Sequence, residues 1–259
     1  MASLPTLVIL AGGASSRMWP LREKSLLRFG EEPLLLSQLQ KYQTLGFQSV
    51  VIVGNPTNQA DIESLIASVN NIQVEVVVQD NPIGMGNALL QTEAFVATQA
   101  SKAMYVTQVH DVVDYDLHQR LLTAHKKKPE ATHIAGYEME DYFPGGYLRV
   151  DADGRVIGIV EKPGPENRPS NLVSIVAHIH ADAGALFDAI KAEYASDTPG
   201  DDHYERAMDV LMQAQEYRVV AYSGEWNALK YPWHVLDIMT YYLGQIDGQD
   251  IADDAFIAE

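Results

Sequence analysis

Residues 7–24 read LVILAGGASSRMWPLREK, and this stretch decides the class of the fold. The apolar run 7–11 has the length and composition of a buried strand, and small residues follow it directly. Backbone N–H groups in such a loop can approach a phosphate chain closely. The residues expected to do so are Ala11, Gly12 and Gly13. Because Arg17 and Lys24 can neutralise the charge of that chain, the segment predicts a cradle for a triphosphate.

The spacing of these glycines excludes the two standard phosphate loops. It fits neither the Walker A pattern nor the dinucleotide pattern G-x-G-x-x-G. The glycines alone favour a plain turn between a strand and a loop. The cations Arg17 and Lys24, which follow in register, favour phosphate binding instead.

Further along the chain, short β-rich runs alternate with amphipathic helical stretches. This is the pattern of a mostly parallel sheet covered by helices on both faces. The expected strands are residues 6–10, 50–53, 74–78, 104–108, 147–150, 156–160, 173–179 and 218–222. The expected helices are residues 34–45, 58–67, 87–97, 117–125, 183–193, 204–215 and 232–245. The strands on either side of the turn sequence DADG are expected to form a β-hairpin in a substrate-side lobe.

The composition narrows the class of partner. The chain carries 18 Lys and Arg against 35 Asp and Glu, a formal net charge of −17 at pH 7. Because this charge repels polyanions, we expect neither a nucleic-acid partner nor a membrane partner, whereas a small anion needs only a local basic pocket. The sequence has no cysteine, which fits a reducing compartment, so a cytoplasmic location is expected.

A second segment, QDNPIGMGNA at residues 79–88, runs from a strand end through a glycine turn into a helix. The carboxamide of Gln79 can donate to and accept from the edge of a pyrimidine, and Gly84 lets a base lie against the backbone. The segment therefore favours a base-binding site. A simple helix-entry turn is the alternative interpretation when the segment is taken alone.

A carboxylate follows the strand at residues 104–108. The carboxyl ends of strands in open α/β sheets are where ligands bind, and Asp111 lies directly after such an end. Mg²⁺ binds through one or two carboxylates together with substrate phosphates, so Asp111 is the candidate metal ligand. Asp114 and Asp116 are interpreted as loop and helix-cap residues.

Together, these segments resemble the sugar-phosphate nucleotidylyltransferases, whose opening motif is L-A-G-G-x-G-[ST]-R followed by a lysine. The seven-residue step from Arg17 to Lys24 is similar to the compact form of the N-acetylglucosamine-1-phosphate uridylyltransferases. The resemblance implies that Arg17 and Lys24 engage the triphosphate. It also implies that Gln79 and Gly84 read uracil or thymine and that Asp111 binds the metal.

The sequence GGYLRVDADGRVIGIVEKP at residues 145–163 resembles the hairpin of the same enzymes. In that hairpin a glycine and a glutamate hold the sugar and a lysine meets its phosphate. The resemblance therefore implies that Gly146 and Glu161 hold the sugar and that Lys162 binds the phosphate. Taken alone, residues 161–163 are typical of an exposed strand end.

Among the departures from the pattern of the family, three change residues that the motifs place in the site. Ser15 replaces the third glycine of the opening motif, and it adds strain if the backbone there has a positive φ. Ser174 replaces an asparagine of the sugar-binding strand, which alters the expected acceptor pocket. In the closing motif W-x-D-x-G-x-P, Ala228 stands where the family has a second metal-binding aspartate. Asn227 could supply its carbonyl oxygen to the metal instead if the backbone shifts by one residue.

Two histidines invite a zinc interpretation. His178 and His180 are two residues apart on an expected strand and so face the same side. Because no third ligand lies nearby in the sequence, we favour a pair of polar residues that line a pocket or face solvent.

We therefore expect a three-layer α/β/α Rossmann-like nucleotidyltransferase fold over residues 1–246, followed by an acidic tail at 247–259. The expected enzyme transfers a nucleoside monophosphate from UTP or dTTP to a sugar 1-phosphate, with Mg²⁺ as cofactor, and releases pyrophosphate. A homo-oligomer is left open. Two alternatives stay open as well: a cytidylyltransferase that acts on a phosphorylated alcohol such as phosphocholine, and a catalytically weakened nucleotide-sugar sensor of the same fold.

Overall fold

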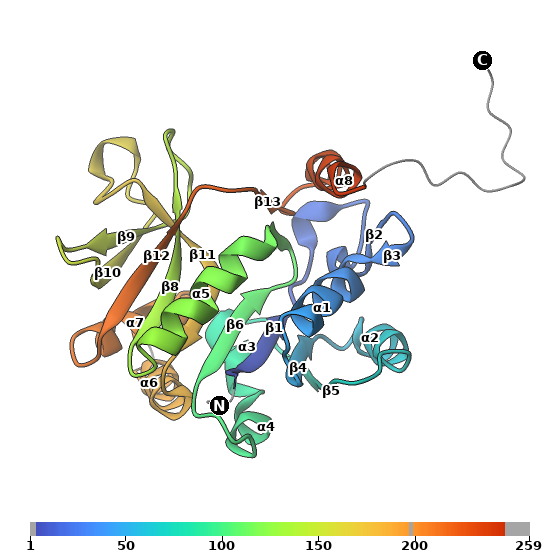
Figure 1. The fold of residues 1–259 in the computed structure, drawn as a ribbon, viewed down its shortest axis with the longest axis horizontal. Helices are drawn as coiled ribbons and strands as arrows, with labels where there is room; N and C mark the ends of the chain where they lie inside the picture. The colour runs from blue at the N-terminus through green and yellow to red at the C-terminus, as the bar shows by residue number, and fades with distance from the viewer. Residues whose placement is uncertain (1–3, 197–198, 247–259) are drawn as a thin grey trace, which may run out of the picture.

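A twisted central sheet runs through the computed structural model, which describes residues 4–196 and 199–246 (Figure 1). The strands of this sheet are β1 (Thr6–Leu10), β4 (Ser49–Gly54), β5 (Gln73–Val78), β6 (Met104–Gln108), β8 (Thr132–Glu138), β9 (Gly146–Val150), β10 (Val156–Glu161), β11 (Leu172–His180) and β12 (Tyr217–Tyr222). The helices are α1 (Leu34–Thr44), α2 (Gln59–Ile66), α3 (Met85–Leu90), α4 (Glu93–Ala97), α5 (Tyr115–Lys127), α6 (Ala183–Ala195), α7 (His203–Met212) and α8 (His234–Gly244). The expected acidic tail at residues 247–259 lies outside the described residues.

The sheet is parallel in its N-terminal half and mixed beyond it. Its main path runs β10-β9-β11-β6-β1-β4-β5, while β8 pairs with β11 and with β12. The pairs of β1 with β4, of β1 with β6 and of β4 with β5 are parallel. Their carboxyl ends therefore meet at one edge, with Leu10 beside both Val53 and Gln108.

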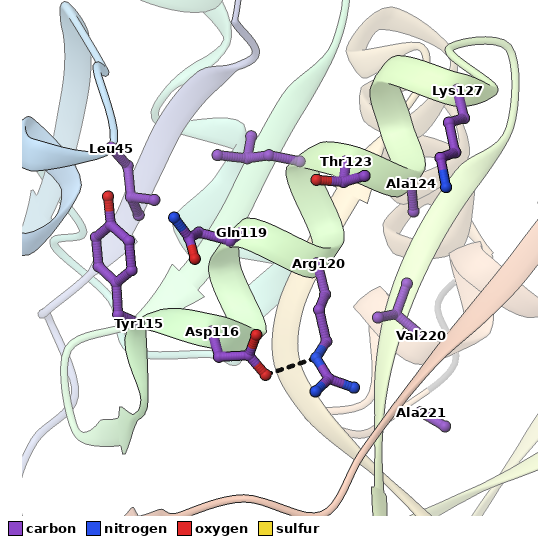
Figure 2. Close-up of a pocket in the computed structure, with 11 residues that line it drawn as sticks. Leu45, Tyr115, Asp116, Gln119, Arg120, Thr123, Ala124, Lys127, Val220 and Ala221 are labelled. Atoms are coloured by element: carbon purple, nitrogen blue, oxygen red, sulfur yellow. Dashed lines mark hydrogen bonds and ion pairs between the residues drawn. The ribbon is translucent and has the colours of Figure 1, made fainter.

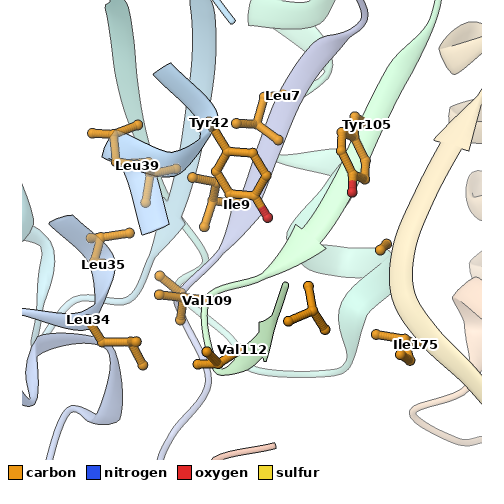
Figure 3. Packing of buried hydrophobic residues seen from close by; sticks show 14 of the residues in the cluster. Leu7, Ile9, Leu34, Leu35, Leu39, Tyr42, Tyr105, Val109, Val112 and Ile175 are labelled. Carbon is orange, nitrogen blue, oxygen red and sulfur yellow. The ribbon is translucent and has the colours of Figure 1, made fainter. Parts of the chain in front are cut away.

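Helices cover both faces of the sheet, which gives three layers. Side chains alternate along β1, so Leu7 and Ile9 join one core cluster and Val8 and Leu10 join the other. The first cluster contains residues of α1, α5 and α8, and the second contains residues of α3, α4, α6 and α7. Figure 3 shows Tyr42 of α1 packed over strand β1 in the first cluster. The three-layer fold that the sequence predicts is confirmed.

Two short ladders lie outside the main sheet. β2 (Arg28–Phe29) pairs with β3 (Glu32–Pro33), and β7 (Asp111–Val113) pairs with β13 (Trp226–Ala228), both antiparallel. The second ladder joins residues more than a hundred positions apart and brings the closing segment of the chain beside the carboxyl end of β6. This ladder, which the sequence did not predict, completes the candidate site.

Two expected elements differ from the structure. Residues 87–97, expected as one helix, form parts of the short helices α3 and α4 with a turn between them. Strand β8 was not expected, because its sequence THIAGYE contains alanine and glycine, which are rare in strands. Its burial between β11 and β12 overrides that local preference. Among the described residues, no helix is long and apolar enough to span a lipid bilayer.

Candidate active site

The loop after β1 carries the first candidate residues on two short 3₁₀ turns. Arg17 lies in the turn Ser16–Met18, and Lys24 begins the turn Lys24–Leu26. The residue before each turn is left-handed, with φ of 51° at Ser15 and 46° at Glu23. The positive φ considered for Ser15 is therefore present. The two bends return the chain so that Arg17 and Lys24 line the same cavity.

Gly12 packs closely against the end of a neighbouring strand, β4. A Cβ atom added at Gly12 would lie 2.7 Å from the carbonyl oxygen of Gly54, at the end of β4. No larger residue fits there without moving one of the two backbones. At Gly13, in contrast, the nearest atom to an added Cβ is Cε of Lys24, at 4.0 Å. Gly12 is therefore fixed by its close approach to Gly54, whereas Gly13 has free space beside it.

A cavity of about 460 Å³ opens at the carboxyl edge of the sheet. Its volume falls within the range of about 300–1,000 Å³ that is typical of small-molecule sites. The sequence-predicted residues that line it are Ala11, Gly12, Gly13, Arg17, Lys24, Gln79 and Gly84. The structure thus brings the two phosphate-loop cations and the expected base-binding residues to one cavity.

Gln79 and Gly84 form a rigid end of this cavity. Gln79 is buried, and its Nε2 atom donates to the carbonyl oxygen of Gly84 at 3.0 Å and to Oδ1 of Asn87 at 3.1 Å. Gly84 has a φ of 101°, and an added Cβ would lie 2.5 Å from the carbonyl oxygen of Asp201. Only glycine fits this position. Since both N–H donors of Gln79 are used within the protein, its Oε1 atom is the group that it can offer to a base.

A smaller cavity of about 200 Å³ continues from the phosphate loop and is lined by Arg17, Lys24, His110 and Lys230. Burial lowers the pKa of Lys24 to about 8, and the positive charges of Arg17 and Lys230 act in the same direction. The carboxylate of Asp111 opposes them. These charges therefore interact with one another, and the site is built around a concentration of cations.

Asp111 begins β7 and is buried, with 8% of its surface exposed. The indole N–H of Trp226 donates to its Oδ1 atom at 3.1 Å. Burial raises the pKa of Asp111, whereas the Trp226 hydrogen bond and the charges of Lys230 and Lys24 lower it. This carboxylate is held in one orientation and interacts electrostatically with the two lysines.

The residues around Asp111 fit a Mg²⁺ ion only in part. Ala228 lies directly opposite Asp111 in the β7–β13 ladder, and Asn227 lies opposite Val112, on the other face. The structure therefore does not bring Asn227 to Asp111. Across residues 4–196 and 199–246 there is no group of three or more His, Cys, Asp or Glu that could hold a metal. The donor set fits a Mg²⁺ that arrives with a triphosphate and takes Asp111 as its protein ligand.

The residues that the sequence predicts to hold the acceptor, Gly146, Glu161 and Lys162, meet at one end of the β9–β10 hairpin. Glu161 is paired with Gly146, and an added Cβ at Gly146 would lie 3.1 Å from Oε2 of Glu161. Lys162 has a φ of 45°, and its Nζ atom lies 3.1 Å from Oε1 of Glu161. Charges on both residues act on Lys230, so the hairpin end lies close to the cation-lined cavity.

Sequence reasoning missed Lys230, which lines the cation-lined cavity and a third, aromatic cavity of about 280 Å³. Tyr137, Phe143 and Trp226 line the aromatic cavity, and the ring of Trp226 lies 5.2 Å from each of the other two rings. The only local signal is that Lys230 stands at the glycine of the closing W-x-D-x-G-x-P motif. That substitution places a cation where the family has no side chain.

His178 and His180 do not face solvent, because each is 1% exposed, and both belong to a buried hydrogen-bonded group. Nδ1 of His178 and Nε2 of His180 each lie 2.8 Å from the hydroxyl oxygen of Tyr204. Nε2 of His178 lies 3.1 Å from the hydroxyl oxygen of Ser174. Three of the four ring nitrogens are therefore engaged within the protein.

A larger, open cavity of about 820 Å³ lies along α5, away from these residues. Figure 2 shows Tyr115, Gln119 and Thr123 on the side of α5 that lines it, with the ion pair between Arg120 and Asp116. None of the sequence-predicted site residues lines this cavity. The sequence-predicted residues that line a cavity do so at the carboxyl edge of the sheet.

The chain was compared with known proteins. The family described as nucleotidyl transferase matches residues 6–228. The chain is 22% identical over 247 residues to the bifunctional protein GlmU of Methanococcus maripaludis strain C5, covering 92% of this chain and 54% of that protein. It is 28% identical over 161 residues to the glucose-1-phosphate thymidylyltransferase of Xanthomonas campestris pv. campestris strain B100. This match covers 60% of this chain and 54% of that protein. The chain thus spans about half the length of the curated relatives it matches.

Solved structures share the fold. A UDP-glucose pyrophosphorylase complexed with UDP-glucose superposes with a TM-score of 0.78 at 17% identity, over 94% of this chain and 100% of the other. A putative glucose-1-phosphate thymidylyltransferase from Bacillus anthracis superposes with a TM-score of 0.76 at 19% identity, over 95% of this chain and 98% of the other. At identities of 17% and 19%, the likeness shows a shared fold and nothing about activity.

Proposed function

The chain belongs to the nucleotidyl transferase family, and we propose that it transfers a nucleoside monophosphate from UTP or dTTP to a sugar 1-phosphate and releases pyrophosphate. The observation that carries this proposal is the meeting of Arg17, Lys24 and Asp111 beside a cavity of about 460 Å³. In a chain of net charge −17, such a concentration of cations next to a glycine loop supports a small anionic ligand. The cysteine-free composition is compatible with the cytoplasm, where we propose that the enzyme acts.

The proposed reaction is an in-line substitution at the α-phosphorus of the triphosphate. An oxygen of the acceptor phosphate forms a new bond to this phosphorus. The bond from the phosphorus to the bridging oxygen of the leaving group breaks, and pyrophosphate departs with that electron pair. The acceptor phosphate is already anionic near neutral pH, so the step needs no general base. Catalysis then depends on positioning and on neutralisation of charge.

Each cation has a place in this scheme. Arg17 and Lys24 line both the large cavity and the cation-lined one, so they would neutralise the triphosphate as its charge moves onto pyrophosphate. Lys162, on the hairpin, would hold the attacking phosphate. Gly146 and Glu161 would hold the sugar, because they lie side by side at the same hairpin end.

Asp111 would hold Mg²⁺ together with oxygens of the triphosphate. When bound, the ion supplies additional positive charge at the phosphates. Trp226 fixes the carboxylate through its indole N–H, and Lys24 and Lys230 stabilise its ionised form. A carboxylate that is oriented in advance loses little freedom when the ion arrives with the nucleotide.

The geometry of Gln79 supports uracil or thymine as the base. Its Oε1 atom can accept the N3–H of either base, whereas N3 of cytosine is itself an acceptor and cannot donate at that position. Gly84 lines the same cavity as Gln79, so a base bound there would lie against its backbone. The preference for UTP or dTTP therefore rests on an acceptor atom that the protein itself holds in position.

The aromatic cavity bears on a second candidate function, the transfer of a nucleotide to phosphocholine. Rings of Tyr137, Phe143 and Trp226 can bind the apolar face of a sugar, and they can equally bind a quaternary ammonium group such as that of phosphocholine. Lys230 lies 4.3 Å from the centroid of the Phe143 ring and already occupies one aromatic face with a positive charge. This contact favours the sugar phosphate over a cationic acceptor.

A substrate panel tests the proposal. Pyrophosphate release is measured with Mg²⁺ for UTP, dTTP and CTP, each combined with several sugar 1-phosphates and with phosphocholine. Release with UTP or dTTP and a sugar phosphate supports the proposal, whereas release only with CTP and phosphocholine supports the second candidate. Calorimetric binding of a nucleotide without release from any pair would contradict the enzyme and favour a sensor of the same fold.

A further inference from the structure

Lys230 is held in a fixed place between β13 and α8. Its backbone N–H donates to the carbonyl oxygen of Ala228 at 2.9 Å and to Nδ1 of His234 at 3.1 Å. Its Nζ atom lies 4.3 Å from the centroid of the Phe143 ring and 5.9 Å from that of Trp226. The side chain is half-buried. Its ammonium group is thus directed by the protein and does not move freely in solvent.

The ammonium group has no close counter-ion. Within residues 4–196 and 199–246, no carboxylate oxygen lies within 4.0 Å of Nζ, although the carboxylates of Asp111 and Glu161 act on it from further away. Arg17 and Lys162 add positive charge nearby. A half-buried cation among other cations is costly unless an anion binds there. The surroundings of Lys230 are therefore those of an anion site.

Lys230 also lies where the two expected substrates meet. It lines the cation-lined cavity together with Arg17 and Lys24, and it lines the aromatic cavity together with Phe143. The first cavity includes residues of the loop after β1. The second is lined by Phe143, whose backbone N–H donates to the hydroxyl oxygen of Tyr147 in the β9–β10 hairpin. A group shared by the two cavities can contact phosphate oxygens from either side.

The β7–β13 ladder has few carboxylates, which also favours binding of an anion beside Lys230. Ala228 lies opposite Asp111, so the β7–β13 ladder presents one carboxylate at this place and a methyl group beside it. Two residues further on, Lys230 contributes an ammonium group that acts on Asp111. The ladder thus carries a built-in positive charge and offers one carboxylate to a metal ion.

We propose that Lys230 is a catalytic residue that binds the α-phosphate of the nucleotide where the acceptor phosphate attacks it, and that its charge makes the enzyme depend less on Mg²⁺. The inference rests on the proposed function and names a residue of the same site. A lysine Nζ donates to phosphate as a charge-assisted hydrogen bond, which strengthens as negative charge grows in the transition state.

The first test measures nucleotide binding in the absence of divalent ions. UTP is titrated calorimetrically in the presence of a chelator into the wild type, Lys230→Met and Lys230→Arg. Methionine keeps the apolar contact with Phe143 and removes the charge, whereas arginine restores the charge. Lys191→Met serves as the matched control. Lys191 of α6 forms an ion pair with Glu93 of α4, and neither residue lines the cavities of the candidate site.

The proposal expects Lys230→Met to weaken metal-free UTP binding about tenfold or more, the value of a hydrogen bond to a charged group. Lys230→Arg and Lys191→Met should bind as the wild type does. Equal affinities of wild type and Lys230→Met, both folded by circular dichroism, would overturn the proposal. The proposal also fails if the wild type binds no UTP without metal.

The second test compares pyrophosphate release with Mg²⁺ and with chelator, using the active pair from the substrate panel. The ratio of the two rates should be larger in Lys230→Met than in the wild type. It should be larger still in the double variant Ala228→Asp/Lys230→Gly, which adds a carboxylate and removes the ammonium. Identical ratios in all three proteins would overturn the role in metal dependence. If no pair reacts, the proposed function fails, and the binding test alone decides on Lys230.

Discussion

The backbone N–H of Lys24 donates a hydrogen bond to the side-chain oxygen of Ser15, with 3.3 Å between the two atoms. Oγ of Ser15 also lies 3.3 Å from the carbonyl oxygen of Gly13. Ser15 has φ of 51° and ψ of 22°, a left-handed conformation that costs a non-glycine residue about 1–2 kcal/mol. The serine side chain thus joins the two ends of the phosphate loop and offsets part of the strain in its own backbone.

Ser15→Ala is expected to lower the free energy of unfolding by about 1 kcal/mol, because it keeps the strained backbone and loses the hydrogen bond to Lys24. Ser15→Gly also loses the bond but relieves the strain, so its effect should be smaller. Urea unfolding of both variants checks this. A larger loss of stability for the glycine variant than for the alanine variant would show that the backbone of Ser15 is not strained.

Lys24→Met should lower kcat for pyrophosphate release by about a hundredfold or more, because a charge that stabilises the transition state is removed. The active pair of the substrate panel serves as substrates. Lys191→Met, which breaks the surface pair with Glu93, is the control and should keep wild-type activity. Near-normal turnover by Lys24→Met would remove Lys24 from the mechanism.

Glu205 of α7 predicts a pH dependence of stability. Its Oε2 atom is buried and, in the described part of the chain, has no hydrogen-bond partner. Burial raises the pKa of Glu205 from 4.5 to about 7, helped by the charges of Glu161, Asp202 and Asp201. The folded state therefore binds the proton more tightly than the unfolded state. The stabilisation is complete below about pH 4.5 and is lost as the pH rises through about 7.

Glu205→Gln, which stays neutral, should nearly match the wild type at pH 4.5 and exceed its stability at pH 8 by about 3 kcal/mol, since one pKa unit is worth about 1.4 kcal/mol. Urea unfolding at the two pH values measures the difference. A difference between the two proteins that does not change with pH would show that Glu205 does not bind a proton in this range.

Tyr204→Phe tests the structural interpretation of the two buried histidines. Loss of the hydroxyl leaves ring nitrogens of His178 and His180 without their partner, so the free energy of unfolding should fall by about 2–4 kcal/mol. A chelator should leave the Tm of the wild type unchanged, because hydrogen bonds hold the rings. A chelator-induced fall in Tm would instead favour the zinc interpretation.

The first half of the site could be predicted from the sequence because it is local. Arg17 and Lys24 lie in one loop, and the strand before them fixes the edge of the sheet at which that loop emerges. Gln79 and Gly84 also follow a strand of the parallel half. The carboxyl ends of adjacent parallel strands meet at one edge, so the cavity followed from the order of elements.

The rest depends on contacts between distant residues. Gly12 is set by its approach to Gly54, which no local pattern records. Lys230 interacts electrostatically with Asp111 because β13 pairs with β7, and the register of that pair also places Asn227 away from the carboxylate. A one-residue shift in such a ladder exchanges the two faces, so the expected role of Asn227 depended on a register that the sequence does not specify.

The most direct test of the account is a crystal structure of the protein with bound UTP. The account predicts the uracil edge at Oε1 of Gln79 and the phosphates within hydrogen-bonding distance of Lys24 and Arg17. Phosphates bound elsewhere, with Lys24 and Arg17 contacting neither the nucleotide nor its metal ion, would contradict it.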